Sequence, residues 1–456
     1  MKCNIYSKLV ALALFAAAAQ PVSAQKNRNL SLDEAVQMSI KNSGQLKLAN
    51  AKVDEAIANY KDAWNNHLPD VKVTGSYLRL DNPNVDLKVK LGGGGSDTGK
   101  SSGGSIKVNQ ALYGLVNASV PLFSGFRIKY GAESAKYLEQ AARLDAEKDK
   151  EDLIQNAINA YSNLYKAQKS VDLVKENLNQ QKQRVTDFSN LEQNGLMARN
   201  DLLKAQLQQS NIELSLLDAQ NNLKITCMNM DLMLGLPEDT DLTPDSTGFQ
   251  NQEDAGSAMQ WEQTALANRK DLSSLSVREQ ATNSMIKSIN GEYYPGLALT
   301  GGYIAADIPN LLTITNALNI GIGLQYNLGA LWKTGAKIDQ AKARLHQLQA
   351  TQGMLSDQVR LEVSQAYQNY LLSVSKIGVY AKAIDQAKEN YRITKNKYDN
   401  NLVTTTDLLE ADVAQLQANL NYTFSKADAL VAYKKLQQTA GIISNINNKG
   451  KMADIH

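Results

Sequence analysis

Four short stretches of this sequence alternate apolar residues with polar or small ones. They cover residues 71–77, 108–122, 297–303 and 318–328. This period of two predicts β-strands that have one apolar and one polar face. Aromatic residues that suit a membrane-interface girdle stand near the strand ends, at Phe123, Phe126, Tyr293, Tyr294 and Trp332. Outer-membrane barrels have such strands, but a soluble sandwich hairpin would show the same pattern, so the strands alone leave both open.

Long helices are predicted after each pair of strands. From about Arg127 to Gln193 the chain has no proline, and its only glycine is Gly131. A helix of this length would span roughly 100 Å, about three times the apolar thickness of a bilayer. Its apolar residues follow a heptad seam that also contains Gln181, at Val171, Val174, Leu178, Val185 and Phe188. The other faces are rich in Gln, Asn, Lys and Asp, so we expect water on one side of these helices and neighbouring helices on the other.

The chain contains two copies of one unit of about two hundred residues. A shift of 226 residues aligns the first parts of the copies, pairing Leu46 with Leu272, Pro69 with Pro295 and Tyr77 with Tyr303. A shift of 206 aligns the remainder, pairing Tyr161 with Tyr367, Asp201 with Asp407 and Gly235 with Gly441. The shifts differ because the Gly/Ser tract 92–105 enlarges a loop in the first copy. Each copy is therefore predicted to run helix, strand, loop, strand, long helix, sharp turn, helix.

The first 24 residues have the features of a secretory signal peptide. Lys2 and Lys8 flank the apolar run 9–19, and Val22-Ser23-Ala24 is a small-x-small cleavage site. Removal of this segment would leave Cys227 as the only cysteine, with 46 basic residues against 46 acidic ones. A net charge of zero argues against nucleic-acid binding, and one thiol cannot form an internal disulfide. Gln25 follows the cleavage site where a lipid-attachment Cys would stand, so we expect no lipid anchor.

No catalytic, cofactor or metal site is predicted. The three histidines, His67, His346 and His456, are far apart in the sequence, which disfavours a zinc or copper centre. Residues 94–101 match the P-loop pattern G-x-x-x-x-G-K-[ST], but a phosphate-binding P-loop needs a helix that starts directly after it. Ser-Gly-Gly-Ser follows instead, at 102–105, so a solvated loop is the favoured interpretation.

Insertion into a membrane would require several copies of the chain. After residue 24 no stretch has 18 consecutive apolar residues, so no transmembrane helix is expected. Four strands cannot close a membrane barrel, whose smallest common form has about 8, and an open sheet edge is not tolerated in lipid. Three chains would supply twelve strands, so we expect a homotrimer if the strands span a membrane.

Six segments, in their order along the duplicated chain, resemble the TolC-like outer-membrane efflux family. They are SLDEAVQMSIKNS (31–43), SVPLFSGFR (119–127), NGLMARNDLLKAQ (194–206), LGLP (234–237), NNLVTTTDLLEAD (400–412) and AGI (440–442). The resemblance implies a mainly α fold with β. It implies an internally duplicated protomer of a trimeric α/β-barrel, in which a 12-stranded outer-membrane β-barrel continues into a long periplasmic α-helical barrel with an equatorial region.

The function that the resemblance implies is that of an exit duct. The chain would serve a tripartite efflux pump or a type I secretion system as a passive conduit, without enzymatic activity or a cofactor. A periplasmic adaptor protein and an inner-membrane transporter would open its periplasmic entrance, and outer-membrane lipid would surround its strands. A periplasmic coiled-coil scaffold or adaptor-like binding protein with a small β-domain is the alternative, which salt alone would extract from membranes.

The resemblance also implies nine segments. They are the signal peptide (1–24), an equatorial segment with the first periplasmic helix (25–66), the first β-hairpin (67–125), a long helix with a tip at 194–200 and a return helix (126–236), an equatorial linker (237–268), a second-copy helix (269–292), the second β-hairpin (293–332), a long helix with a tip at 400–406 and a return helix (333–442), and a C-terminal tail (443–456).

The two tips are expected to form the periplasmic entrance. By motif position, the residues that would narrow it are Asp201, Tyr398, Asp407 and Glu410. The residues that would contact the adaptor are Asn194, Gly195, Leu196, Met197, Asn400, Asn401, Leu402 and Val403. Val403 stands where some family members have an arginine that holds the entrance shut, and Asn401 where glycine is usual. A simpler interpretation stays open, in which Asp407 caps a helix and Glu410 faces solvent.

Overall fold

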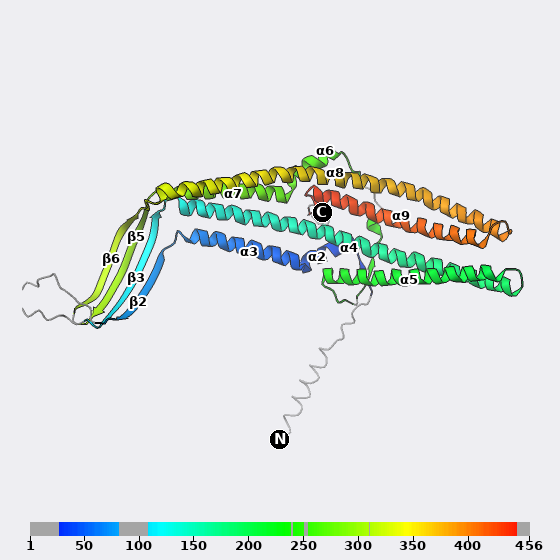
Figure 1. Cartoon of the computed structure of the whole chain (residues 1–456), viewed down its shortest axis with the longest axis horizontal. Helices are drawn as coiled ribbons and strands as arrows, with labels where there is room; N and C mark the ends of the chain where they lie inside the picture. The colour runs from blue at the N-terminus through cyan, green and yellow to red at the C-terminus, as the bar shows by residue number, and fades with distance from the viewer. Residues whose placement is uncertain (1–26, 82–107, 239, 250–253, 310, 445–456) are drawn as a thin grey trace, which may run out of the picture. The chain divides into compact units, whose positions relative to one another are not determined.

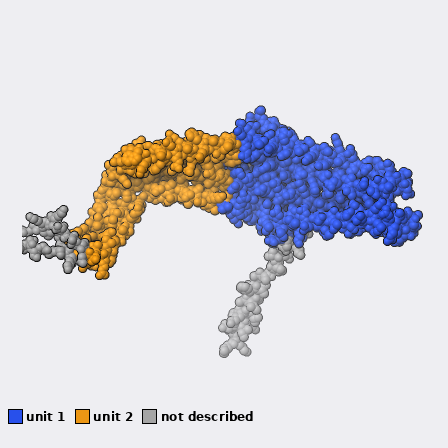
Figure 2. All heavy atoms as spheres, viewed as in Figure 1, with its two compact units in different colours: residues 1–48, 147–270, 356–456 blue, residues 49–146, 271–355 orange. Residues whose placement is uncertain are grey.

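The computed structural model describes residues 27–81, 108–238, 240–249, 254–309 and 311–444. The expected signal peptide, the Gly/Ser tract with its P-loop pattern and most of the expected C-terminal tail lie outside the described residues. The chain divides into two compact units (Figure 2). Unit 1 comprises Met1–Leu48, Glu147–Lys270 and Ser356–His456, and unit 2 comprises Ala49–Ala146 and Asp271–Leu355.

Unit 2 contains a four-stranded antiparallel sheet (Figure 1). Its strands are β2 (Asp70–Arg79), β3 (Gln110–Phe123), β5 (Gly296–Ile308) and β6 (Leu312–Gln325), in the order β2-β3-β5-β6. The two predicted strand pairs are thus present, and they join through β3 and β5. Strands β2 and β6 lie at the two edges of this sheet.

The register of the sheet aligns the alternating faces of all four strands. Val73 pairs with Val116, which pairs with Tyr303, which pairs with Leu318. Because paired residues of antiparallel strands lie on the same face, the apolar positions form one continuous surface. This surface is exposed in the chain, with 78% of Val73 and 81% of Leu318 accessible to solvent. A neighbouring row on the opposite face is polar or small, with Lys72, Asn117, Gly302 and Asn319.

Helices make up most of the rest of the described chain. Their bounds are α2 (Leu32–Asn42), α3 (Gly44–Asn65), α4 (Arg127–Gln193), α5 (Arg199–Leu234), α6 (Ala258–Asn268), α7 (Lys270–Asn290), α8 (Ala330–Asp399) and α9 (Thr405–Thr439), with short 3₁₀ turns η1 (Thr247–Phe249) and η2 (Gly291–Tyr293). Across the described ranges, none of these helices is long and apolar enough to cross a membrane. In unit 1, α5 returns along α4 and α9 returns along α8 (Figure 1).

The predicted heptad seam packs these helices together. Val174 and Leu178 of α4 are buried with Ile212 of α5 in one apolar cluster. Phe188 of α4 and Leu202 of α5 belong to a second cluster near the end of the hairpin. Gln181, the polar residue of the seam, is fully buried. The seam therefore joins α4 and α5 as the apolar spacing predicted.

The internal duplication is visible in local structure as well as in sequence. Ser31 caps α2 and Ser257 caps α6, and the two positions differ by the same shift of 226 residues that aligns the copies. In each copy a buried or part-buried tyrosine anchors a neighbouring segment. Tyr161 donates a hydrogen bond to the carbonyl of Leu30 (2.9 Å), and Tyr367 donates one to the carbonyl of Gly256 (3.0 Å).

One strand pair was not predicted. β1 (Asn27–Leu30) and β4 (Asp241–Pro244) pair in parallel within unit 1. Leu30 and Leu242 from this pair are buried in a core cluster with Tyr161 and Leu164 of α4. Strands of four residues are too short for a period of two to stand out in the sequence.

Candidate functional site

Two sharp turns join the long helices of unit 1, one between α4 and α5 and one between α8 and α9. Gly195 (φ 68°) and Asn401 (φ 57°) have left-handed backbone conformations at the ends of α4 and α8. The next amide in each turn bonds back into the helix, from Leu196 to the carbonyl of Leu191 and from Leu402 to that of Lys397, both at 2.9 Å. This geometry ends a helix tightly, and Gly and Asn adopt it most readily, which is why the sequence marked these positions.

Each turn presents one large apolar side chain to solvent. Leu196 is 76% exposed and Leu402 is 73% exposed. The apolar residues that follow them, Met197 and Val403, are partly buried, and Met197 packs against the buried cluster of Phe188, Leu202, Ala205 and Leu408. An unbranched, flexible methionine suits this role, since it can cover the irregular end of a helical hairpin.

Asp407 forms a capping box at the start of α9. Its carboxylate accepts bonds from the backbone N–H and the hydroxyl of Thr404, both at 2.7 Å, while its own N–H donates to the Thr404 hydroxyl oxygen (3.3 Å). These bonds from Thr404 hold the pKa of Asp407 below its usual value. Within one chain, Asp407 therefore has the contacts of a helix-capping residue.

The corresponding turn before α5 lacks such a cap. Ala198 occupies the N-cap position of α5 and makes no side-chain hydrogen bond. Asp201, the counterpart of Asp407, instead forms an ion pair with Lys204 at 3.3 Å. The two acidic residues thus occupy equivalent positions but have different partners, so they provide a matched pair for mutagenesis.

Tyr398 lies in the last turn of α8, between the two hairpins. Its ring stacks on Phe188 of α4 with centroids 5.6 Å apart, and its hydroxyl accepts a bond from Thr405 (3.4 Å). Burial raises the pKa of Tyr398, and the negative charge of Asp201 adds to the rise. Tyr398 and Asp201 therefore lie within electrostatic reach of each other, whereas Asp407 is engaged with Thr404.

Glu410 lies on a groove between α5 and α9. The groove has a volume of about 540 Å³. Lys204 and Gln208 line it from α5, and Leu409, Glu410 and Val413 line it from α9. The structure of one chain therefore separates the four predicted entrance residues into a capped Asp407, a solvent-facing Glu410, and the neighbours Asp201 and Tyr398.

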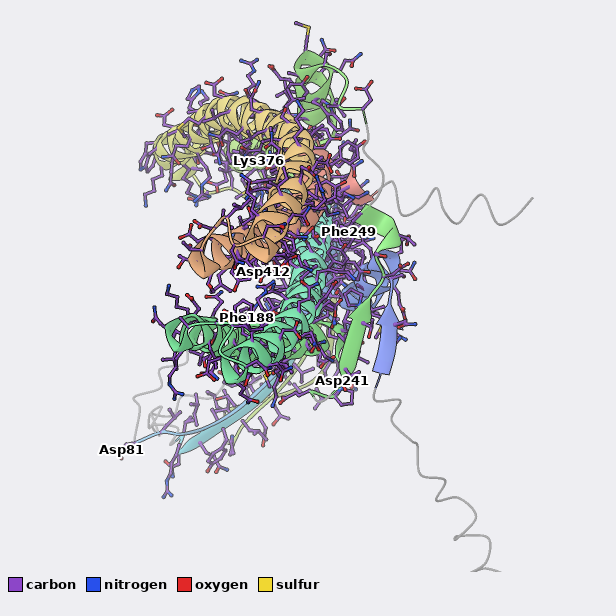
Figure 3. The ribbon with its side chains drawn as sticks, turned by 90° about the vertical axis from the view of Figure 1, so that its right-hand side faces the viewer. Asp81, Phe188, Asp241, Phe249, Lys376 and Asp412 are labelled. Atoms are coloured by element: carbon purple, nitrogen blue, oxygen red, sulfur yellow. The ribbon has the colours of Figure 1, made fainter. Side chains whose placement is uncertain are left out.

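A buried ion pair near the turns was not predicted. Arg184 of α4 contacts the carboxylate of Asp412 on α9 at 3.0 Å, and their side chains are only 9% and 3% exposed. The other guanidinium nitrogen of Arg184 donates to the Tyr391 hydroxyl of α8 (2.8 Å). Figure 3 labels Asp412 and Phe188 where the two hairpins face each other.

Amide side chains complete the network around this ion pair. Gln181 accepts a bond from Arg184 (2.8 Å) and donates one to the carbonyl of Ala205 on α5 (2.9 Å). The network therefore joins all four helices of the two hairpins. The available signal in the sequence was the position of Arg184, three residues after Gln181 and four before Phe188, on the seam face of α4.

The described part of the chain holds no group of three or more His, Cys, Asp or Glu side chains that could bind a metal ion. Polar side chains at the turns are engaged in helix capping, ion pairs and packing between helices. Their geometry supplies exposed charge and exposed apolar side chains at the end of the helical hairpins.

Comparison with known proteins identifies relatives over about two thirds of this chain. The alkaline protease secretion protein AprF of Pseudomonas aeruginosa is 21% identical, over 64% of this chain and 62% of its own length. The outer membrane efflux protein BepC of Brucella suis is 23% identical, over 65% of this chain and 66% of its own length. The chain thus matches just under two thirds of the length of each relative.

Solved structures share the fold over nearly the entire chain. The Campylobacter jejuni CmeC outer membrane channel superposes with a TM-score of 0.73, at 17% identity, over 93% of this chain and 89% of that chain. The sequence model of the outer membrane efflux proteins matches residues 35–236 and 261–442, one range in each copy of the duplication. Together the two ranges cover most of the sequence, and the chain therefore belongs to the outer membrane efflux protein family.

Proposed function

We propose that three copies of this chain form a channel that serves as the exit duct of a tripartite efflux pump or a type I secretion system. The chain belongs to the outer membrane efflux protein family, and in this proposal it is an outer-membrane protein with a periplasmic helical portion that acts in transport as a passive conduit. The observation that carries the proposal is the exposed apolar face of the four-stranded sheet.

The chemistry of this face matches lipid. Four apolar residues that follow one another on the same face of β6 are exposed, at Leu318, Ile320, Ile322 and Leu324. A continuous apolar surface of this kind is unfavourable in water and marks a surface that is covered by lipid or protein. The opposite face carries Lys72, Asn117 and Asn319, which suit a water-filled interior.

The edges of the sheet favour a closed assembly. β2 and β6 each have a hydrogen-bonded neighbour on one side only within the described sheet. Unpaired backbone groups are strongly disfavoured in the hydrocarbon region of a membrane. Pairing of β2 from one chain with β6 from the next would satisfy both edges, and three chains would close twelve strands.

The turns of the helical hairpins serve as the periplasmic entrance in this proposal. In a trimer Asp201, Tyr398, Asp407 and Glu410 would each recur three times around the channel axis. Rings of like charge in a narrow mouth attract cations and repel each other. Leu196 and Leu402 supply exposed apolar contacts for a periplasmic adaptor, which would link the channel to an inner-membrane transporter.

The trimer is tested by its mass and its extraction behaviour. Native mass spectrometry in detergent is expected to give about three times the mass of the processed chain, and salt washing is expected to leave the protein in the membrane fraction. A stable monomer with full β-content would contradict the trimer. Release by salt without detergent would instead support the periplasmic scaffold.

The entrance is tested by single-channel conductance in planar bilayers. We expect the double variant Asp407→Asn with Glu410→Gln to lose cation selectivity, because it removes six carboxylates from the mouth of a trimer. Thr404→Ala is the matched control, since it removes the capping hydroxyl but leaves both charges in place. It should lower thermal stability slightly and leave selectivity unchanged. If the double variant keeps its cation selectivity, these carboxylates stabilise the helix and do not determine selectivity.

The pH dependence of selectivity follows from the lowered pKa of Asp407. A carboxyl group whose pKa is depressed in the folded state stays ionised through mild acid and protonates only when the pH falls through that lowered pKa. The contribution of Asp407 to selectivity should therefore persist as the pH falls past the usual aspartate pKa of about 3.9, and be lost only below it. Its contribution to the stability of α9 should be lost over the same range, because the cap needs the ionised form.

Adaptor docking is tested by photo-crosslinking in cells. A crosslinker placed at Leu196 or Leu402 is expected to capture a periplasmic protein, because these side chains are the exposed apolar positions of the turns. Met259 of α6 is equally exposed and lies away from the turns in sequence, so it serves as the control. Docking at the turns would be refuted by capture at Met259 alone, or by no capture at either turn.

A further inference from the structure

A ladder of aromatic rings leads from the apolar face of the sheet onto α4. A β-bulge after Pro121 brings Phe123 opposite Leu297, which in turn pairs with Leu324 on the apolar face. The ring of Phe123 contacts that of Phe126 edge to face, with centroids 5.3 Å apart. Phe126 lies 6.4 Å from Tyr130 in the first turn of α4. The ladder thus runs continuously from the lipid-like surface to the helix.

Two lysines lie over the last ring of this ladder. The ammonium group of Lys129 is 5.7 Å from the centroid of Tyr130, and that of Lys287, from α7, is 5.5 Å from the same centroid. Both lysines are exposed, and their ring contacts are the interactions that the described part of the chain shows for them. Because both ammonium groups lie near one ring, an anion bound beside that ring would be attracted by both charges.

Close backbone packing fixes the two helices that carry these lysines. A Cβ atom built on Gly125 would lie 2.2 Å from the carbonyl oxygen of Gly291, and one built on Gly291 would lie 2.3 Å from the carbonyl oxygen of Gly125. Only glycine permits this approach. Ser288 of α7 also donates a hydrogen bond to the carbonyl of Arg127 (2.9 Å). The backbone segments that carry the two lysines are therefore fixed next to each other.

The backbone of Phe126 carries local strain that directs its ring. Phe126 has φ 63°, a left-handed conformation that disfavours residues with a Cβ. Its ring is nevertheless more than half exposed, so burial of the ring does not account for this conformation. Strain of this kind persists where the surrounding structure or a function requires the conformation.

The second copy of the duplicated unit lacks this arrangement. By the shift of 206 residues, Trp332 corresponds to Phe126 and Lys333 to Arg127, so the aromatic and the adjacent cation are retained. Gly335 and Ala336 stand in place of Lys129 and Tyr130. The aromatic at the strand end is thus common to both copies, whereas the adjacent lysine and tyrosine at the start of the long helix occur in the first copy alone.

We propose that Lys129 and Lys287, held over Tyr130, bind the phosphate of an anionic phospholipid at the periplasmic boundary of the membrane. The order of groups along the ladder, from exposed apolar strand to aromatic rings to ammonium groups, matches the order of acyl chain, glycerol region and phosphate in a lipid. The inference rests on the proposed function, in which the strands span the membrane. The inference adds a specific lipid partner to the proposed channel.

The test measures lipid binding to the detergent-solubilised full-length protein by native mass spectrometry, with phosphatidylglycerol as the probe and phosphatidylcholine as the reference lipid. The unmodified protein is expected to prefer phosphatidylglycerol, and Lys129→Gln with Lys287→Gln to lower that affinity about tenfold. The control, Lys333→Gln with Lys342→Gln, removes the same charge from α8 and should change the affinity less than twofold. Lys129→Arg with Lys287→Arg should retain binding, which separates loss of the site from misfolding.

Three results would overturn the lipid site. They are equal binding of the two lipids by the unmodified protein, equal losses in the two glutamine variants, and displacement of phosphatidylglycerol by millimolar inorganic phosphate, which would identify a small soluble anion as the ligand. Insertion into nanodiscs of pure phosphatidylcholine tests the proposed function separately. A protein that inserts there but shows no lipid preference would refute this inference and leave the membrane channel intact.

Discussion

Replacing Asp412 with alanine is expected to destabilise the folded chain by about 3–5 kcal/mol. The substitution leaves the guanidinium of Arg184 buried without its carboxylate partner, in a position where its side chain is only 9% exposed. Thermal unfolding monitored by circular dichroism measures the effect. The replacement of both partners, Arg184→Met with Asp412→Leu, should recover most of the loss, because no uncompensated charge then remains.

An exposed ion pair provides the comparison for this prediction. Asp428 contacts Lys166 at a site where the aspartate side chain is about half exposed. Asp428→Ala should cost less than about 1 kcal/mol, since solvent screens such pairs. If Asp412→Ala costs no more than Asp428→Ala, the Arg184–Asp412 contact is not the structural link between hairpins that its burial indicates.

A lysine in place of Ile320 is expected to reduce the amount of folded protein in the outer membrane severely. Ile320 lies within β6 on the exposed apolar face, between Leu318 and Ile322. A lysine on the lipid face costs about 2–4 kcal/mol near the middle of the bilayer, and a trimer would bear this cost three times. Quantification of heat-modifiable or trimeric protein in outer-membrane fractions measures the effect.

The neighbouring residue gives a control with the same chemical change. Asn319 pairs with Gly302 on the polar face of the sheet, so Asn319→Lys would place the new charge toward water. It should assemble nearly as well as the unmodified chain. Equal tolerance of both lysines would indicate that neither face contacts lipid, as the periplasmic scaffold would require.

Most of the fold could be predicted because its elements leave patterns in consecutive residues of the sequence. The alternation of β6 and the uninterrupted stretch of α4 extend over many residues, and Gly195 and Asn401 mark the turns by their own backbone preferences. β1 and β4 escaped prediction because each has four residues and its partner lies far away in the sequence. The duplication gave the order of elements in the second copy once the first copy was interpreted.

The candidate site was predicted less completely for a different reason. Arg184 and Asp412 are 228 residues apart, so no local pattern indicates that they meet. The position of Asp407 indicated both a cap and an entrance residue, and its bonds to Thr404 are those of a cap. An entrance role requires the copies of Asp407 from neighbouring chains to lie around one axis. The sequence of one chain indicates such a ring only if a symmetric trimer is assumed.

The buried ion pair breaks the equivalence of the two repeats. The positions that correspond to Arg184 and Asp412, by the shift of 206 residues, hold Asn390 and Gln206, which are neutral and exposed in the chain. In a closed ring of three chains, the contact between α4 and α9 within a chain would alternate with one between α8 and α5 of adjacent chains. Each chain would then move as a stiff block of two hairpins, with softer joints at the chain boundaries. Six similar hairpins would surround the tunnel, but only the three boundaries between chains would lack the buried ion pair. The tunnel would therefore widen at these three boundaries.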